Sequence, residues 1–425
     1  MTYFVEGIQG SGKSTLVKLL SEKYPDHKVL EEGDYSPVEL AWCAYIGMED
    51  YQAALGKHPS LKQEIEAKTH FEDDHAVVCY TKIRTDDRSF YQAMEKYEIY
   101  TGSMPFERFK EIVLKRYSSW DGAPLITECA LFQNIVEDMI LFRDMPDEEI
   151  IDFYRELKKA TGDKQFHIAY LKAEPDDIRR NLETARQTRV DDKGNEVWFA
   201  MLCDYFNSSP HAVRNGLEGE YGLVRHWIHR QELELRICAE LFPDRCTVLP
   251  SKKYGEKDID KFGIEIRRFR EEDANEVSDV IRKTIRISNT KDYPVELMDE
   301  LIASETPEAV SERASWTHFY VACDEEKIIG CGAIGPYWGK EDESSLFTVF
   351  VLPEYQGKGI GRSIVETLEK DEFFLRAERI EIPASITGVP FYLKMGYHYK
   401  NGITTPDEEH LIRLEKLNAS ELREV

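Results

Sequence analysis

Several features that mark particular classes of protein are missing from this sequence. Its eight cysteines are scattered, with no Cys-x-x-Cys pair and no histidine partner at zinc-site spacing. No run of about 18 apolar residues exists, so no transmembrane helix is predicted. The N-terminus also lacks the pattern of a signal peptide. We therefore expect a cytoplasmic protein whose reduced thiols act as small core residues.

Basic residues are scarce relative to acidic ones. The chain has 55 Lys+Arg against 80 Asp+Glu, a formal net charge of −25. Binding to nucleic acid or to an anionic membrane needs a basic face, and so neither is expected as a partner. One basic pocket for a nucleotide remains compatible with this charge. The acidic surface favours a cationic small molecule instead.

The length of 425 residues exceeds what one ordinary core accommodates, so we expect more than one domain. The stretch "LPSKKYGEKDIDKF", residues 249–262, is polar and has no apolar period. It predicts a first domain over residues 1–250, a linker over 251–261 and a second domain over 262–425. The oligomeric state stays open.

Short apolar runs separated by helical stretches predict an α/β first domain with a doubly wound parallel sheet. The predicted strands are residues 3–5, 28–30, 125–127, 166–171 and 246–249. Two long segments, residues 38–115 and 175–242, are interpreted as mostly helical insertions. Within the first, residues 75–83 ("HAVVCYTKI") fit a helix or a strand equally well.

Strand patterns dominate after the linker and predict an α+β second domain with a mostly antiparallel sheet. A strand and an amphipathic helix are predicted within residues 263–285. A meander follows, then alternating helices and strands. Its predicted elements are strands 317–323, 327–334 and 346–351, helix 359–370, strand 379–384, helix 389–395 and two strands near residues 397 and 411.

The first of two glycine-rich turns follows the N-terminal strand. Gly7, Gly12, Lys13 and Ser14 satisfy G-x-x-x-x-G-K-[ST] and precede an apolar-periodic helix. Glycines let backbone N–H groups wrap around phosphate oxygens, lysine reaches the terminal phosphates, and the serine hydroxyl can bind Mg²⁺. The predicted nucleotide-binding residues of this turn are Gly7, Gln9, Gly10, Ser11, Gly12, Lys13, Ser14 and Thr15.

This region resembles the P-loop kinase superfamily, in particular the small nucleoside, nucleotide and antibiotic kinases. The resemblance implies ATP or GTP with Mg²⁺. It also implies an acid after the second strand that accepts the proton of the acceptor hydroxyl, and Glu32 and Asp34 in "VLEEGDYSPVELAW" match. Glu128, at the end of the third strand in "PLITE", matches an acid that holds Mg²⁺ together with Ser14 or contacts the acceptor. The matching lid arginines are Arg179, Arg180, Arg186 and Arg189.

Each of these side chains also has a structural alternative. Glu32 and Asp34 can cap a helix near Pro37. Glu128 can be a solvated strand-end acid, and the arginines can form surface ion pairs. Where deoxynucleoside kinases have Glu-Arg-Ser after the third strand, this chain has Glu128-Cys129-Ala130. The acceptor therefore cannot be transferred from that family.

The second glycine-rich turn is "QGKGIG", which starts at Gln356 and matches [QR]-x-x-G-x-[GA] between a strand and a helix. Such a turn can hold a pyrophosphate on backbone N–H groups. With "ASITGVPFYLKMGYHY" it resembles the GNAT acetyltransferases over about residues 262–417, which implies acetyl-CoA as cofactor. The implied acetyl-CoA-binding residues are Phe350, Val351, Gln356, Gly357, Lys358, Gly359, Ile360, Gly361, Arg362 and Ser385.

The same resemblance implies a catalytic role for Tyr392, which matches the tyrosine that protonates the leaving thiolate. Glu341 and Glu343 are open alternatives for the general base. Ser385 stands where many relatives have an asparagine near the pantetheine arm of CoA. As alternatives, Tyr392 packs in the core, Gln356 only shapes the turn, or the domain binds CoA without catalysis.

Together these features predict a bifunctional group-transfer enzyme. Catalytic Lys13, Glu32 or Asp34, and Glu128 would serve phosphorylation of a small-molecule hydroxyl, and Tyr392 the N-acetylation of an amine. A compound rich in hydroxyls and amines, such as an aminoglycoside, would satisfy both reactions. The alternatives are a nucleoside or nucleotide kinase fused to an independent acetyltransferase, a nucleotide-regulated protein acetyltransferase, or a non-enzymatic scaffold. His226 and His229 have no interpretable ligand spacing.

Overall fold

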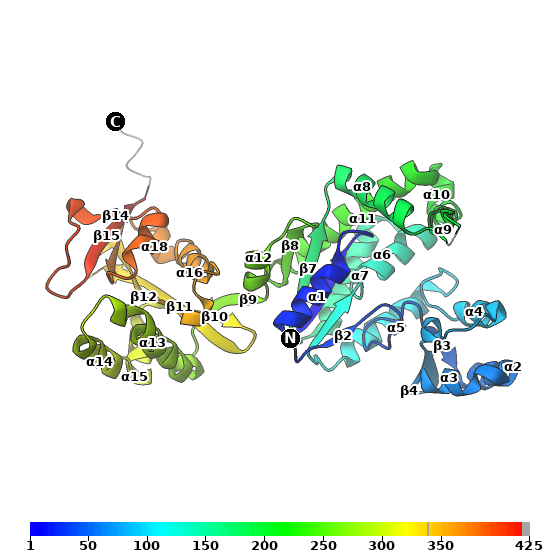
Figure 1. Ribbon diagram of the computed structural model, residues 1–425, viewed down its shortest axis with the longest axis horizontal. Coiled ribbons are helices and arrows are strands. Elements are labelled where there is room, and N and C mark those ends of the chain that lie inside the picture. Colours follow the sequence, from blue (N-terminus) through cyan, green and yellow to red (C-terminus); the bar gives the residue numbers. More distant parts are fainter. Residues whose placement is uncertain (192, 338–339, 419–425) are drawn as a thin grey trace. The chain divides into compact units, whose positions relative to one another are not determined.

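The computed structural model describes residues 1–191, 193–337 and 340–418. The chain divides into two compact units, Met1–Gly255 and Glu256–Val425 (Figure 1). The predicted linker spans this division and contains a short helix, α12 (Glu256–Lys261). None of the helices in the described residues is long and apolar enough to cross a membrane.

A five-stranded sheet forms the centre of unit 1, with the order β2-β6-β1-β7-β8. Every neighbouring pair in it is parallel, as the sequence predicts. All six residues of β1 are buried, because helices cover both faces of a parallel sheet. The strands are β1 (Thr2–Gly7), β2 (Lys28–Leu30), β6 (Leu125–Glu128), β7 (Phe166–Lys172) and β8 (Cys246–Pro250).

The helices that pack around this sheet share one hydrophobic core with it. Helix α1 begins directly after the first glycine turn, and α6 continues into a π-helical turn, η3 (Asp138–Phe142). The helices are α1 (Lys13–Lys23), α5 (Phe106–Ser119), α6 (Gln133–Glu137), α7 (Asp147–Thr161), α8 (Pro175–Thr188), α9 (Val197–Asn207), α10 (Pro210–Asn215) and α11 (Gly219–Leu241).

The insertion predicted as mostly helical over residues 38–115 has helices as its main elements, but it also contains a sheet that the prediction did not include. It holds a three-stranded antiparallel sheet, β3-β5-β4, with three helices and a core of its own (Figure 1). The elements are β3 (Ala44–Gly47), α2 (Met48–Lys57), α3 (Lys62–Ala67), β4 (Thr69–Glu72), β5 (His75–Val78) and α4 (Arg88–Glu95). The second insertion is helical, from α8 to α11.

Strand β5 explains why periodicity could not assign residues 75–83. Val77 packs into the main core of unit 1, whereas Ala76 and Val78 pack into the core of the inserted sheet. Successive side chains of a strand point to opposite faces, and here both faces are buried. Residues 76–79 are therefore all apolar, which removes the alternation that identifies a half-buried strand.

A seven-stranded sheet forms unit 2, with the order β14-β15-β13-β12-β11-β10-β9. All its neighbours are antiparallel except β12 and β13, which confirms the mostly antiparallel prediction. The strands are β9 (Ile264–Arg268), β10 (His318–Asp324), β11 (Lys327–Tyr337), β12 (Lys340–Val351), β13 (Arg379–Ala384), β14 (His398–Tyr399) and β15 (Ile412–Leu417).

The helices of unit 2 pack against this sheet around a second core. Helix α16 approaches β11 closely at Gly332, where a Cβ atom would lie 2.6 Å from Cγ2 of Ile364. The helices are α13 (Ala274–Ser288), α14 (Val295–Ser304), α15 (Pro307–Trp316), α16 (Ile360–Leu368), α17 (Glu372–Leu375) and α18 (Val389–Lys394).

We expect that Gly7, at the end of β1, cannot be replaced by a residue with a side chain without loss of stability. Its φ is 135°, and a Cβ atom would lie 2.7 Å from the carbonyl oxygen of Leu171 on β7. A strained backbone costs about 1–3 kcal/mol, and the clash with a backbone atom adds to it. We expect Gly7→Ala to lower the free energy of unfolding by at least about 2 kcal/mol in urea titrations of the full chain.

Gly56→Ala is the matched control, because Gly56 lies in α2 with open space around its Cα. Alanine is favoured over glycine in helices by about 1 kcal/mol, so this variant should be as stable as the wild type or more stable. Equal stability of Gly7→Ala and the wild type would contradict the close packing of β1 and β7.

Glu6 on β1 is a fully buried carboxyl group. Its Oε1 accepts a hydrogen bond from the backbone N–H of Leu131 at 2.6 Å, whereas Oε2 has no partner. Burial raises the pKa of Glu6 from 4.5 to about 8. Between these values the unfolded chain releases a proton that the folded chain keeps, so this group destabilises the fold increasingly as pH rises through the window.

We therefore expect Glu6→Gln to raise the melting temperature, relative to the wild type, by more at about pH 9 than at about pH 5. Scanning fluorimetry of both proteins at the two pH values measures this difference. All other ionisable groups are the same in the two proteins, so their effect on the melting temperature cancels in the comparison. Glu22→Gln, at an exposed position of α1, should show no such pH dependence. An equal shift at both pH values would mean that Glu6 is already ionised in the fold.

Candidate functional sites in the two units

The first glycine turn links β1 to α1 through backbone that favours glycine. Gly7, Gly10 and Gly12 have φ values of 135°, 76° and 98°. Gly12 is the N-cap of α1, so unpaired N–H groups of the first helical turn lie next to it. A Cβ atom at Gly10 would lie 3.2 Å from Asn181 Cβ, and one at Gly12 3.3 Å from Lys252 Cγ. The turn is thus enclosed by α8 and by the loop after β8.

Lys13 folds back onto this turn and is almost fully buried. Its Nζ donates to the carbonyl oxygens of Gly7 at 2.9 Å and Ile8 at 3.1 Å. A third hydrogen bond, 3.1 Å long, reaches Oε1 of Gln133 on α6. The ammonium group is therefore held at the turn by three oxygen atoms and provides a positive charge there.

Ser14 and Glu128, the two predicted metal ligands, contact each other. The Ser14 hydroxyl donates to Glu128 Oε1 at 3.2 Å. Burial raises the pKa of Glu128, although Lys13 and Ser14 act in the opposite direction. In the described part of the chain, no group of three or more His, Cys, Asp or Glu side chains could hold a metal. Oxygen ligands suit Mg²⁺, whose remaining positions would be filled by phosphate and water.

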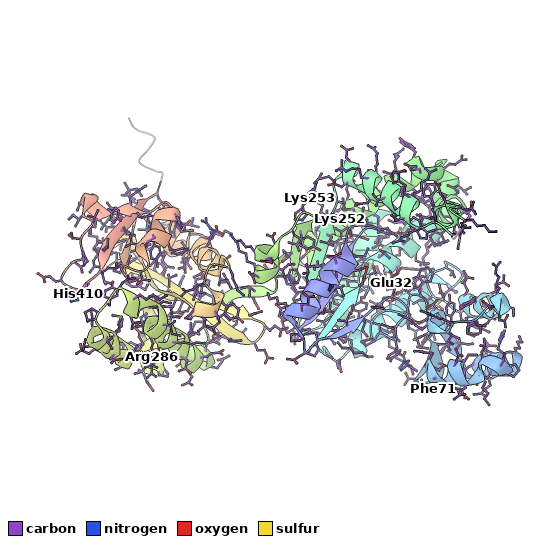
Figure 2. All side chains as sticks on the ribbon, viewed as in Figure 1. Glu32, Phe71, Lys252, Lys253, Arg286 and His410 are labelled. Atoms are coloured by element: carbon purple, nitrogen blue, oxygen red, sulfur yellow. The ribbon has the colours of Figure 1, made fainter. Side chains whose placement is uncertain are left out.

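A cavity of about 340 Å³ lies over the turn and gathers residues from eight segments of unit 1. Glu32 and Lys252 reach it from the loops after β2 and β8, as labelled in Figure 2. Of the predicted residues, those that line it are Gln9, Gly10, Gly12, Lys13, Ser14, Thr15, Glu32, Glu128 and Arg189. Gly7 and Ser11, the other two predicted residues of the turn, are buried.

The structure separates the two candidate acids after β2. Glu32 lines the cavity, and its Oε1 accepts a hydrogen bond from Gln133 Nε2 at 3.2 Å. Asp34 instead forms an ion pair with Lys82 at 3.1 Å and accepts from the N–H of Glu31 at 3.0 Å. Residues 35–43 contain no helix, so the alternative that these acids cap a helix near Pro37 is wrong.

The four predicted lid arginines all lie on α8 or at its end, but only Arg189 reaches the cavity. Its guanidinium lies 4.5 Å from the ring centroid of Trp198. The other three are paired with carboxylates. The pairs are Arg179 with Asp176, Arg180 with Asp177, and Arg186 with Glu196.

Sequence analysis missed five polar or aromatic residues of this cavity, namely Gln133, Asn181, Trp198, Trp227 and Lys252. Lys252 adopts a left-handed conformation, and its Nζ donates to Asn181 Oδ1 at 2.7 Å. Lys252 lies in the polar stretch that we predicted as a linker. Its position directly after the last strand could have indicated a site residue, because the carboxyl ends of parallel strands meet at one edge of the sheet.

A buried charge network supports the glycine turn from below. Arg230 of α11 is fully buried and donates to Gln9 Oε1 at 2.9 Å. It also forms ion pairs with Glu137 and Glu234. Breaking a buried ion pair leaves an uncompensated charge, so this network holds the turn in one position.

The second glycine turn, in unit 2, leads from β12 into α16. Gly357 and Gly359 have φ values of 79° and 88°, and Gly359 is the N-cap of α16. Gln356 points into the protein, because its Nε2 donates to Val351 O at 2.9 Å and to Ser288 Oγ at 3.1 Å. The Gln356 side chain thus shapes the turn, which agrees with the alternative that it is a turn residue only. An anion would then bind to the backbone N–H groups of the turn.

The other predicted residues of this turn differ in exposure. Ile360 is buried, and a Cβ atom at Gly361 would lie 3.5 Å from Phe391 Cζ. Lys358 forms an ion pair with Asp260 at 3.2 Å, and half-exposed Arg362 approaches Glu366 at 3.8 Å.

Strands β12 and β13 diverge before the turn. They pair only from Glu343 to Ser345 on β12, so Phe350 and Val351 pair with β11 alone. Strand β12 also bulges at Thr348, whose φ is 55° and whose carbonyl accepts from Cys331 Sγ at 3.3 Å. The opening leaves backbone groups of β12 available to an extended ligand.

Tyr392 on α18 is buried and packs edge-on against Phe391 and Tyr397. Burial raises its pKa, so the phenol keeps its proton over the physiological range. Ser385 Oγ accepts from the N–H of Gly388 at 3.2 Å and shapes the loop before α18. Tyr392 therefore combines core packing with a retained donor proton.

The two candidate bases lie at the start of β12. Burial raises the pKa of Glu343, but Lys340 and Arg379 outweigh it and lower the net value. A carboxylate held in this way is a weak proton acceptor. Glu341 is exposed, and its backbone carbonyl accepts from Arg376. Neither position identifies a base.

Comparison with solved structures returns acetyltransferases that align with about a third of the chain. The PaiA N-acetyltransferase of Thermoplasma acidophilum, solved with coenzyme A, is 20% identical, with 36% of this chain and 99% of that chain covered and a TM-score of 0.33. An acetyltransferase of Streptococcus agalactiae is 17% identical, with coverages of 37% and 99% and a TM-score of 0.29. The ribosomal-protein-S5-alanine acetyltransferase of Vibrio fischeri is 17% identical, with coverages of 37% and 94% and a TM-score of 0.28.

A family model described as "Acetyltransferase (GNAT) domain" matches residues 315–399. This range contains β10 to β14, the bulge in β12, the second glycine turn and Tyr392. Unit 2 therefore carries a GNAT acetyltransferase domain.

Proposed function

We propose that the protein transfers two groups to small molecules, an acetyl group in unit 2 and a phosphoryl group in unit 1. The acetyl transfer is supported by the GNAT domain and its glycine turn. One observation carries the phosphoryl transfer. A single cavity brings together the glycine turn, Lys13, the Ser14–Glu128 pair and Glu32.

In the proposed phosphoryl transfer, unit 1 acts as a P-loop kinase. The turn and Lys13 hold the phosphates of ATP or GTP, and Arg189 adds positive charge from α8. Mg²⁺, held by Ser14 and Glu128, would neutralise charge on the terminal phosphates. Glu32 is the proposed base that orients the acceptor hydroxyl and takes its proton, because it lines the cavity and Asp34 does not.

Gln133 connects the two ends of this arrangement. Its Oε1 accepts from Lys13 and its Nε2 donates to Glu32, at 3.1 and 3.2 Å. A rigid amide between cation and base supports a fixed distance from the terminal phosphate to the acceptor, and such positioning is the main requirement of phosphoryl transfer.

In the proposed acetyl transfer, the turn from Gln356 to Gly361 binds the pyrophosphate of acetyl-CoA. The free edge of β12 next to Phe350 receives the extended arm that carries the thioester. A neutral amine attacks the thioester carbonyl, the C–S bond breaks, and the Tyr392 phenol donates a proton to the leaving thiolate. The acetylated nitrogen releases its extra proton to water, and water returns a proton to the Tyr392 phenolate. The net charge of −25 favours a cationic acceptor, and an aminoglycoside-like compound offers both amine and hydroxyl groups.

The kinase half is tested by mass spectrometry of a pool of aminoglycosides, nucleosides and polyamines incubated with the full chain and Mg-ATP or Mg-GTP. We expect one compound class to gain a phosphate. Lys13→Ala should slow this by about 10²–10³-fold, because a cation at the transferring phosphate is lost. Lys18→Ala, at an exposed position of the same helix, should have no effect.

Glu32 and Asp34 form a second matched pair. Glu32→Gln should reduce the phosphorylation rate by about 10²–10⁴-fold, whereas Asp34→Asn should retain it. The reverse order would transfer the role of base to Asp34. If no small molecule is phosphorylated, and acetylation of added protein changes with bound nucleotide, unit 1 is a nucleotide-dependent regulator instead.

The acetyl half is tested by following CoA release with acetyl-CoA and the same amines. We expect Tyr392→Phe to lower kcat by at least about tenfold, with little change in the KM for acetyl-CoA, because the phenol acts on the leaving group. Tyr399→Phe on β14 is the control for loss of a hydroxyl. An unchanged kcat would leave Tyr392 as a packing residue only.

A further inference from the structure

Helix α12 lies in unit 2 beside the second glycine turn, although it precedes the range that matches the GNAT family model. Its Asp260 forms an ion pair with Lys358 of the turn at 3.2 Å, and its Ile259 is buried. The ion pair between Asp260 and Lys358 thus anchors the helix at the turn. The last residue of α12, Lys261, is thereby brought to the turn.

Lys261 lies directly over Gly359. A Cβ atom at Gly359 would lie 2.2 Å from Cε and 2.8 Å from Nζ of Lys261. This space exists only because position 359 is a glycine, with a φ of 88°. The ammonium group therefore lies at the surface of the turn where the helix α16 begins.

The chemistry of this position points to an anion. Gly359 is the N-cap of a nine-residue helix, whose first N–H groups carry partial positive charge. These groups repel an ammonium ion, so nothing in the turn itself stabilises Lys261 there. A phosphate placed between them would bind to both. Lys358 differs, because Asp260 already neutralises it.

We propose that Lys261 is a phosphate ligand for acetyl-CoA, contributed by the helix ahead of the acetyltransferase domain, and that the Asp260–Lys358 pair holds this helix at the turn. This inference depends on the proposed binding of acetyl-CoA at the second turn. Lys261 contacts the phosphate end of the cofactor and not the thioester. It therefore contributes to cofactor affinity and leaves the chemical step unchanged.

Isothermal titration of the full chain with CoA tests the inference without relying on activity. A charged hydrogen bond is lost, but Lys261 is exposed to solvent, so we expect Lys261→Ala to raise the Kd for CoA by about five- to thirtyfold. The loss should shrink at high salt. Lys261→Arg should restore most of the affinity. Lys257→Ala, at an exposed position of the same helix, should bind CoA like the wild type.

Acetyl-pantetheine, which has no phosphate, provides an independent readout. Turnover with it should be equal in the wild type and Lys261→Ala, whereas turnover with acetyl-CoA should show a raised KM and the same kcat. Equal or tighter CoA binding by Lys261→Ala would overturn the role of Lys261 and leave the proposed function intact. Failure of the wild type to bind CoA would overturn both.

Discussion

Both candidate sites depend on one backbone constraint, a glycine turn that ends a strand and opens a helix. At Gly12 and Gly359 the chain adopts φ values of 98° and 88° at the helix N-cap. A left-handed N-cap without a side chain leaves the first N–H groups of the helix uncovered. That geometry suits an anion, and the remaining residues of each site are arranged around the turn.

The two turns are held in place by different means. Below the first, fully buried Arg230 donates to Gln9 and is paired with two carboxylates. Below the second, Gln356 ties the turn to β12 and to Ser288 of α13. In both turns a glutamine side chain, Gln9 or Gln356, points into the protein and forms hydrogen bonds that support the turn. Backbone groups and a lysine, Lys252 or Lys261, lie on the outer face.

Residues distant in the sequence complete both sites. Gln133 comes from α6 and Lys252 from the loop after β8, and both reach the first turn. Lys261 comes from α12 and reaches the second. The polar stretch between the units therefore supplies one lysine to each turn, within its own unit. This stretch has the composition of a linker because most of its side chains form contacts at the surface and few of them pack in a core.

The sequence by itself determined the strands of the parallel sheet, the mostly antiparallel second sheet and both glycine turns. These are local properties, since hydrophobic period and glycine spacing act over a few residues. Only the tertiary structure showed that Glu32 and Arg189 line the cavity while Asp34 and the other three arginines do not, and only it revealed the inserted sheet. Those outcomes depend on contacts between distant segments, and strand β5 carried no local signal because both of its faces are buried.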